Sequence, residues 1–168
     1  MPNIVQLNDI SNGYIGTNTD NNTSSTTITL LGSFEINPNT YTTNDYVSFG
    51  ALFSNNSTVS GCNFYLYINS ANTLTNAIQL GKYSASTSDG LVYLNRRILI
   101  KNSTGGGTGV NQGTQVITNS LSSISDFTSS TTIPLSIDWT KAVNFIAAAS
   151  TNNVSDLAWF YGFKVFKY

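Results

Sequence analysis

Alternation of apolar and polar residues with a period of two recurs along this chain from about residue 25 to its end. The segment CNFYLYIN (62–69) shows it most clearly, because Cys, Phe, Leu and Ile alternate there with Asn, Tyr, Tyr and Asn. A half-buried β-strand produces this pattern, whereas the 3.6-residue period of an amphipathic helix is nearly absent. We therefore expect an all-β fold, with Cys62 on a buried face.

Clusters of Asn, Ser, Gly and Thr separate about nine such segments and are typical of turns. The expected strands cover residues 25–36, 45–53, 62–69, 77–83, 91–101, 114–119, 131–138, 142–150 and the last segment. Short strands at this spacing predict a single-domain antiparallel β-sandwich, jelly-roll-like, at residues 25–168. Residues 1–24 are expected to form an N-terminal arm, and Pro134 belongs on an edge strand or at a bulge.

Residues 138–149 leave two alternatives open. Asp138 could cap a short helix that places Trp139, Val143 and Ile146 in one stripe. A strand is favoured, because every neighbouring segment is expected to be a strand.

The charge content excludes several classes of partner. Only 9% of the residues are charged, against about 25% in ordinary soluble domains, and the net charge is −1. Nucleic-acid binding requires clustered Lys and Arg, so no nucleic acid is expected as a partner. The start MPNIVQLNDIS lacks the features of a secretory signal, and no apolar run is long enough for a membrane span.

The residue types in the sequence also argue against catalysis. The chain has no histidine, which removes the commonest general base and most zinc and copper sites. Glu35 and the seven aspartates fall mostly at turns or strand ends, and no lysine follows the glycines of TGGGTGV as a phosphate-binding loop requires. We expect no enzyme, no cofactor and no metal site.

The last segment, DLAWFYGFKVFKY (156–168), is apolar on both sides when it is treated as a regular strand. Strict alternation would place Phe160, Phe166 and Tyr168 on the outward side. Exposed aromatic side chains of this size approach the largest apolar patch that a monomer tolerates. These three residues are therefore the candidate oligomer interface, and Phe160→Asp is expected to dissociate the oligomer without unfolding the sandwich. The alternative is a cover formed by the arm or by loop 102–113.

Three other aromatic residues are candidates for contact with a glycan. An aromatic ring with a polar tip offers a flat apolar face on which a sugar ring can stack. Alternation turns Tyr65 and Tyr67 outward, and Trp139 follows a strand. Packing across strands or contact between subunits is the simpler interpretation of the two tyrosines.

The segment FEINPNTYTTNDYVSFGALFSN (34–55) resembles small jelly-roll proteins and fibre domains of tailed-phage virions. In that family a similar Ile-Pro-x-Asn-Thr element is followed by an Asp, and Ile36, Pro38, Asn39, Thr40 and Asp45 match it. Asn37 separates Ile36 from Pro38, which is a departure from the pattern. Residues 65–83, 93–101 and 137–168 also look like corresponding parts, so that the likeness covers about residues 25–168.

The resemblance implies a non-enzymatic virion component, commonly trimeric, such as a capsid decoration protein, a head fibre or a tail-fibre domain. The expected partners are further copies of the chain and the major capsid protein or another virion protein, with assembly in the host cytoplasm. The arm would then anchor the subunit to its partner through Ile4, Val5, Leu7 and Ile10. The alternative function is a receptor-binding or carbohydrate-binding module that recognises a glycan of the host surface.

Overall fold

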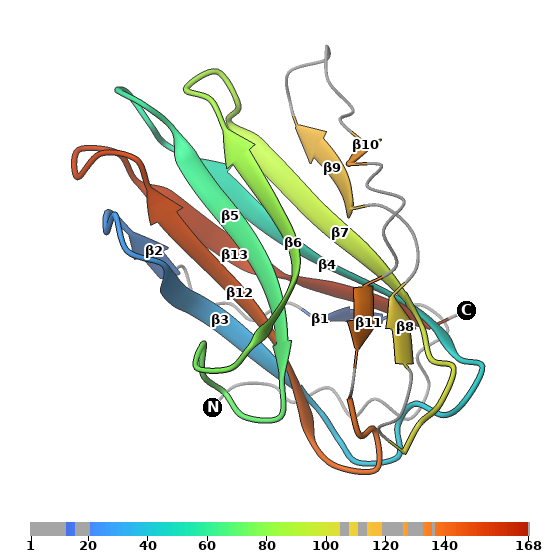
Figure 1. Ribbon diagram of the computed structural model, residues 1–168. Coiled ribbons are helices and arrows are strands. Elements are labelled where there is room, and N and C mark those ends of the chain that lie inside the picture. Colours follow the sequence, from blue (N-terminus) through green and yellow to red (C-terminus); the bar gives the residue numbers. More distant parts are fainter. Residues whose placement is uncertain are drawn as a thin grey trace.

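The computed structural model describes residues 21–104 and 137–167, and the backbone of five further short strands before and between them. Within this part of the chain every regular element is a strand, which confirms the expected all-β fold. Two antiparallel sheets face each other as the layers of a jelly-roll-like sandwich (Figure 1).

The smaller sheet has four strands. Its order is β3 (Thr29–Ile36), β12 (Val143–Thr151), β5 (Cys62–Asn69) and β6 (Ile78–Ala85). Strand β12 settles the open alternative for residues 138–149 in favour of a strand, preceded by a turn in which the Lys141 N–H donates to the carbonyl of Asp138 at 3.2 Å.

The larger sheet is built on three long strands with short strands at both sides. Its main path is β1 (Gly13–Ile15), β13 (Ala158–Lys167), β4 (Tyr46–Asn55), β7 (Leu91–Leu99), β8 (Thr108–Val110) and β11 (Ile133–Leu135). Off this path, β2 (Asn21–Thr23) pairs with β13, β9 (Thr114–Thr118) with β7, and β10 (Asp126–Phe127) with β9. Each of the nine expected segments contains a strand, and Pro134 lies in the last strand of the main path, as expected.

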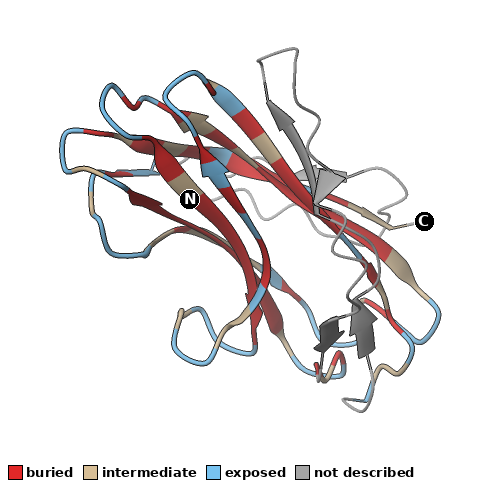
Figure 2. Ribbon diagram, turned by 45° about the horizontal axis from the view of Figure 1, so that its top comes forward, coloured by how far each residue is buried: buried red, intermediate tan, exposed pale blue. Residues whose placement is uncertain are grey.

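The core lies between the two sheets, where aromatic rings from one layer meet rings from the other. The Phe49 ring of β4 stacks on the Phe145 ring of β12 with centroids 3.9 Å apart, and Phe53 stacks on Phe64 of β5 at 4.7 Å. Stacked pairs of this kind add to the free energy gained from burial alone. Cys62 lies on the same inner face and is fully buried, as predicted. Figure 2 shows buried residues along the strands and exposed residues mainly in the connecting loops.

A β-bulge in β13 changes which side chains face the core. Phe160 pairs with Phe53 but the next paired residue is Gly162, opposite Leu52, so that Tyr161 is an extra residue in this strand. Alternation therefore restarts after the bulge, and the inward residues are Ala158, Phe160, Phe163 and Val165, all fully buried. The prediction that Phe160 faces outward is wrong, because it assumed a strand without a bulge.

The corner between β3 and β4 contains the INPNT element. Asn39 has a positive φ of 61°, a conformation that asparagine tolerates better than most residues. Its N–H donates to the carbonyl of Trp139 at 2.8 Å, which ties the corner to the turn before β12. This contact fixes one end of the sandwich.

Asp156 holds a loop at the opposite end of β5. Its carboxylate is completely buried and accepts hydrogen bonds from the N–H groups of Thr58, Val59 and Ser60 at 2.9, 2.9 and 3.0 Å, and from the Ser60 hydroxyl at 3.1 Å. Burial alone would raise the pKa of Asp156, but the hydrogen bonds from these backbone N–H groups lower it below its ordinary value. The charged carboxylate thus organises the loop before β5.

A carboxylate with a lowered pKa contributes stability that is present above its pKa in the unfolded chain and is lost as the pH falls through its pKa in the folded chain. We expect urea unfolding to show this loss below about pH 4, the ordinary range of an aspartate. Asp156→Asn should be less stable at pH 7 and should have a flatter stability profile between about pH 5 and pH 2. An unchanged profile in the variant would contradict this role of Asp156.

Candidate functional site

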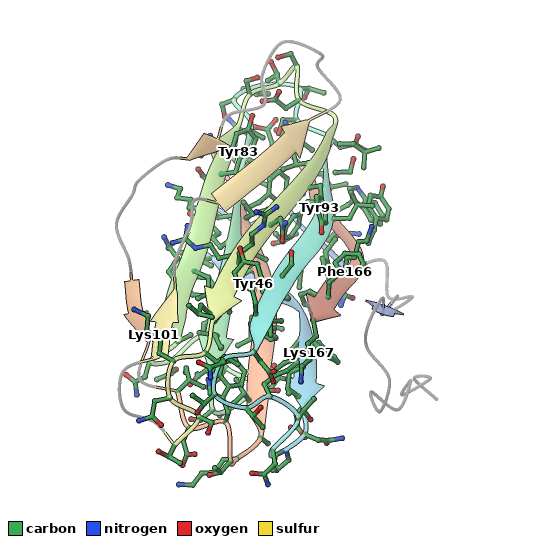
Figure 3. All side chains as sticks on the ribbon, turned by 90° about the vertical axis from the view of Figure 1, so that its right-hand side faces the viewer. Tyr46, Tyr83, Tyr93, Lys101, Phe166 and Lys167 are labelled. Atoms are coloured by element: carbon green, nitrogen blue, oxygen red, sulfur yellow. The ribbon has the colours of Figure 1, made fainter. Side chains whose placement is uncertain are left out.

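The outer face of the larger sheet carries an exposed aromatic surface. Because Ala158 and Phe160 face the core and the bulge follows, Trp159, Tyr161 and Phe166 of β13 face outward. Tyr93 of β7 faces outward as well, opposite Leu52 of β4. We call Trp159, Tyr161, Phe166 and Tyr93 the aromatic face. Tyr161 is 40% exposed, and the other three side chains are half-buried. Figure 3 labels Tyr93 and Phe166 on neighbouring parts of this sheet.

A glycine of β4 lies beneath one of these aromatic side chains. The Tyr93 ring lies directly over Gly50, because a Cβ atom added there would be 2.4 Å from the Tyr93 hydroxyl oxygen and 2.6 Å from Cζ. The buried Ser48 hydroxyl donates to Oδ1 of Asn95 at 2.8 Å. The Tyr93 ring thus lies against the sheet at Gly50, and two buried polar side chains of the same sheet are hydrogen-bonded to each other.

The charged groups on this surface are cationic. Among the described outward side chains of β4, β7 and β13, Lys164 and Arg97 carry charge and no carboxylate is present. The ammonium of Lys164 lies 4.8 Å from the centre of the Phe166 ring, a cation–π contact that leaves the lysine exposed. The surface therefore combines aromatic rings with two exposed cationic side chains.

Tyr65 and Tyr67 do face outward from the smaller sheet, as predicted, but they are only 6% and 9% exposed. Their rings are 5.9 Å apart and inclined by 23°, and they form an apolar cluster with Ile146 and Ala148 of β12. Leu74, in the turn after β5, packs against the same cluster. Burial raises the pKa of Tyr67 above its ordinary value. These rings are therefore covered in this structure and do not present an open face to a sugar.

The prediction that Trp139 contacts a glycan at the surface is wrong, because its side chain is only 1% exposed. Its ring meets Tyr41 edge-on with centroids 5.6 Å apart and also contacts Phe145 of the core. Its position just outside a strand suggested exposure, but the INPNT corner closes over it through the hydrogen bond from Asn39.

The residues predicted to form an oligomer interface or an anchor lie in different parts of the structure. Phe160 is part of the core, and Phe166 remains on the outer face of β13. Tyr168 and the proposed anchor residues Ile4, Val5, Leu7 and Ile10 lie outside the described residues. Self-association and attachment to a virion partner stay predictions.

Most of the described carboxylates are engaged in local structure. Asp45 forms an ion pair with Lys167 at 2.7 Å, Asp89 accepts from the Ser86 N–H at 2.9 Å, and Asp138 accepts from the Thr140 N–H at 3.1 Å. The described residues contain no group of three or more His, Cys, Asp or Glu side chains that could hold a metal ion. In the same part of the chain, no helix has the length and apolar character needed to cross a bilayer.

The sequence contained a signal for the aromatic face that strict alternation overlooks. Gly162 interrupts a strand of large side chains, and an isolated glycine inside a strand pattern often marks a bulge. Placing the bulge at Tyr161 and Gly162 would have turned Trp159 and Tyr161 outward and both Phe160 and Phe163 inward.

Comparisons with known proteins give distant similarities of fold. No family model matches the sequence, and a search of curated proteins gives no significant match. Among solved structures, TmCBM61 in complex with β-1,4-galactotriose has a TM-score of 0.37 at 9% identity, covering 81% of this chain and 61% of that one. A GH43 glycoside hydrolase has a TM-score of 0.46 at 9% identity, covering 84% and 36%. The winged bean acidic lectin complexed with methyl-α-D-galactose has a TM-score of 0.42 at 8% identity, covering 95% and 92%.

The chain thus spans less than two thirds of the first two of these structures. TM-scores below 0.5 at such identities do not transfer a function, so the function of this chain is inferred from its own side chains.

Proposed function

We propose that this chain is a non-catalytic carbohydrate-binding module whose glycan lies along the aromatic face. The observation that carries the proposal is the set of outward aromatic side chains on the central strands of the larger sheet, Trp159, Tyr161 and Tyr93, in a chain rich in small neutral polar residues. Contiguous exposed apolar surface on a soluble domain marks a place of interaction.

The shape and chemistry of the surface suit a sugar. Trp159 and Tyr161 present flat apolar rings, on which the C–H face of a pyranose ring can lie, and the tyrosine and indole groups keep a polar edge for hydrogen bonds. The half-buried Trp159 lies in a strand whose backbone is paired on both sides at this residue, with Asn22 of β2 and Ser54 of β4. Rings that are already held in place lose little conformational entropy when a ligand binds.

The cations on this face favour acidic glycans over their neutral analogues. Lys164 and Arg97 are both exposed, and the described outward side chains of the three central strands include no carboxylate to repel an anion. An acidic polysaccharide should therefore bind more tightly at low salt, and its affinity should fall as salt screens the charges.

A glycan array that includes neutral and uronic-acid-containing oligosaccharides tests the proposal, followed by calorimetric titration of the best ligand. Trp159→Ala is expected to weaken binding roughly tenfold or more, as truncation of a central aromatic contact does. Val154→Ala is the matched control, because Val154 is an apolar side chain that is 73% exposed and lies outside the aromatic face. Equal affinities of the two variants for the ligand, or an array without ligands, would refute the proposal.

A second candidate function is a structural subunit of a tailed-phage virion that associates with copies of itself. The same observation favours it, because aromatic residues are enriched in the cores of protein–protein interfaces. Light scattering separates the two candidates. A monomer that binds glycan supports the module, whereas an oligomer that Tyr161→Asp dissociates supports the subunit.

A further inference from the structure

A pocket of about 340 Å³ opens at the end of the sandwich where β5 ends and β12 begins. It shares no residue with the aromatic face. Its volume lies at the small end of the range of ligand pockets, about 300–1,000 Å³. The apolar part of its lining consists of Ile68, Ile78, Ile137 and Val143, of which Ile68 and Val143 are almost fully buried and Ile78 is the most exposed.

The rim of the pocket is polar and carries one charge of each sign. It is formed by Ser70, Asn76, Asp138 and Lys141. The ammonium of Lys141 lies 3.5 Å from a carboxylate oxygen of Asp138, and their side chains are 76% and 34% exposed. An ion pair this exposed contributes little to stability, so a ligand can insert into it at small cost.

The pocket wall is held rigid while part of its rim stays available. The Asn69 amide donates to the carbonyls of Thr73 and Thr75 at 2.8 and 3.0 Å, which fixes the turn after β5. In contrast, the Ser70 hydroxyl and the Asn76 side-chain amide have no hydrogen-bond partner among the described residues. Asn76 also has a positive φ of 60°, so the turn holds this amide at the pocket in a conformation that few residues adopt.

These features select the chemistry of the ligand. A hydroxyl group placed against Ile78, the most exposed of the four aliphatic side chains, would lose hydrogen bonds to water without replacing them, which is unfavourable. A methyl group would suit this apolar lining. The rim offers a carboxylate that accepts a hydrogen bond and an ammonium that donates one, which complements the N–H and C=O of a single neutral amide. A charged ligand would attract one of the two side chains, Asp138 or Lys141, and would be repelled by the other.

We propose that this pocket binds the acetamido group of an N-acetylated sugar. The methyl group lies against the apolar lining, the amide N–H donates to Asp138, and the amide oxygen accepts from Lys141. The sugar ring lies at the mouth, beside Ser70 and Asn76. The site stands independently of the aromatic face, since it recognises a substituent of the sugar and not the flat face of the ring.

The test is a ¹H–¹⁵N NMR titration of the whole chain with methyl N-acetyl-β-D-glucosaminide, and with methyl β-D-glucoside as the matched probe that lacks the acetamido group. Saturable shifts at the backbone amides of Ser70, Asp138 and Lys141 are expected with the first probe and not with the second. Equal shifts with both probes, or no saturable shift at these amides, would overturn the assignment. Shifts confined to β13 would place the sugar on the aromatic face and would equally overturn it.

Two variants sharpen the result. Asp138→Asn removes the charged acceptor and should weaken the binding of the acetamido probe about tenfold. Asn72→Ala changes an exposed residue in the same turn that does not line the pocket, and it should leave the affinity unchanged. Near-UV circular dichroism confirms that both variants are folded. Equal affinities of the two variants would show that Asp138 does not hold the ligand.

Discussion

Phe160→Asp is expected to unfold this protein. The Phe160 side chain is completely buried, with ring centroids 4.8 Å from Phe163 and 5.7 Å from Phe53. It also presses on Gly32 of β3, where an added Cβ would lie 2.9 Å from Cδ1 of the Phe160 ring. Truncating a buried phenylalanine to alanine costs about 3–5 kcal/mol, and a buried unpaired carboxylate adds to that. The loss is comparable to the whole stability of a domain, about 5–15 kcal/mol.

Urea unfolding followed by near-UV circular dichroism measures this effect. Tyr161→Asp is the matched control, because it places the same charge one residue further along, on an outward side chain. The control variant should keep its near-UV signal while Phe160→Asp loses it. If Phe160→Asp stayed folded and only formed a smaller oligomer, Phe160 would face outward, as regular alternation of β13 predicts. That result would contradict the bulge.

Gly61→Ala is expected to cost about 2–4 kcal/mol of unfolding free energy, since overpacking typically costs 1–3 kcal/mol and a positive φ adds to it. Gly61 has a φ of 89°, and a Cβ atom at this position would lie 2.1 Å from the carbonyl oxygen of Ala85. That oxygen belongs to the backbone of β6, so a side-chain rotation cannot relieve the contact. The carbonyl of Gly61 also accepts from the N–H of Asn152 at 3.0 Å, which resists movement of the loop.

Gly61→Asn separates the two causes, because asparagine tolerates positive φ but carries the same Cβ atom. Urea unfolding should show a loss for both variants, and the loss should be smaller for Gly61→Asn, because the contact of Cβ with Ala85 remains while the cost of the positive φ is reduced. A Gly61→Asn protein as stable as the original would show that φ alone matters and that Ala85 moves away. A Gly61→Ala protein without any loss would place the loop before β5 differently from this structure.

Local patterns were sufficient to predict the layers of the fold. Alternation located the nine main strands, the inward position of Cys62 and the edge position of Pro134, because each depends on one strand and its own two faces. Strand β12 was also predicted, although Asp138 and Trp139 allowed a helix. The deciding factor there is tertiary, since β12 is buried on both sides between β3 and β5.

The candidate site could be predicted only in part, because it depends on a register shift and on contacts between distant segments. The extra residue at Tyr161 reverses which side chains face the core after the bulge. Regular alternation therefore predicts Phe160 on the outer face and Trp159 on the inner face, which is the reverse of the observed arrangement. Trp139 was misplaced because its cover comes from Asn39 and Tyr41, about 100 positions earlier in the chain. The pocket has no local pattern at all, since β5 and the turn before β12 meet only in the folded sandwich.

The most direct measurement of the central claim uses the fluorescence of a single tryptophan. The chain has two, and Trp139→Phe leaves Trp159 as the only one while removing an indole N–H that has no hydrogen-bond partner in the described structure. Acrylamide should quench the emission of this folded variant efficiently, and an acidic oligosaccharide should shift the emission to shorter wavelength and protect it from quenching. A glycan that binds the variant while leaving the emission and the quenching of Trp159 unchanged would contradict a glycan site on the aromatic face.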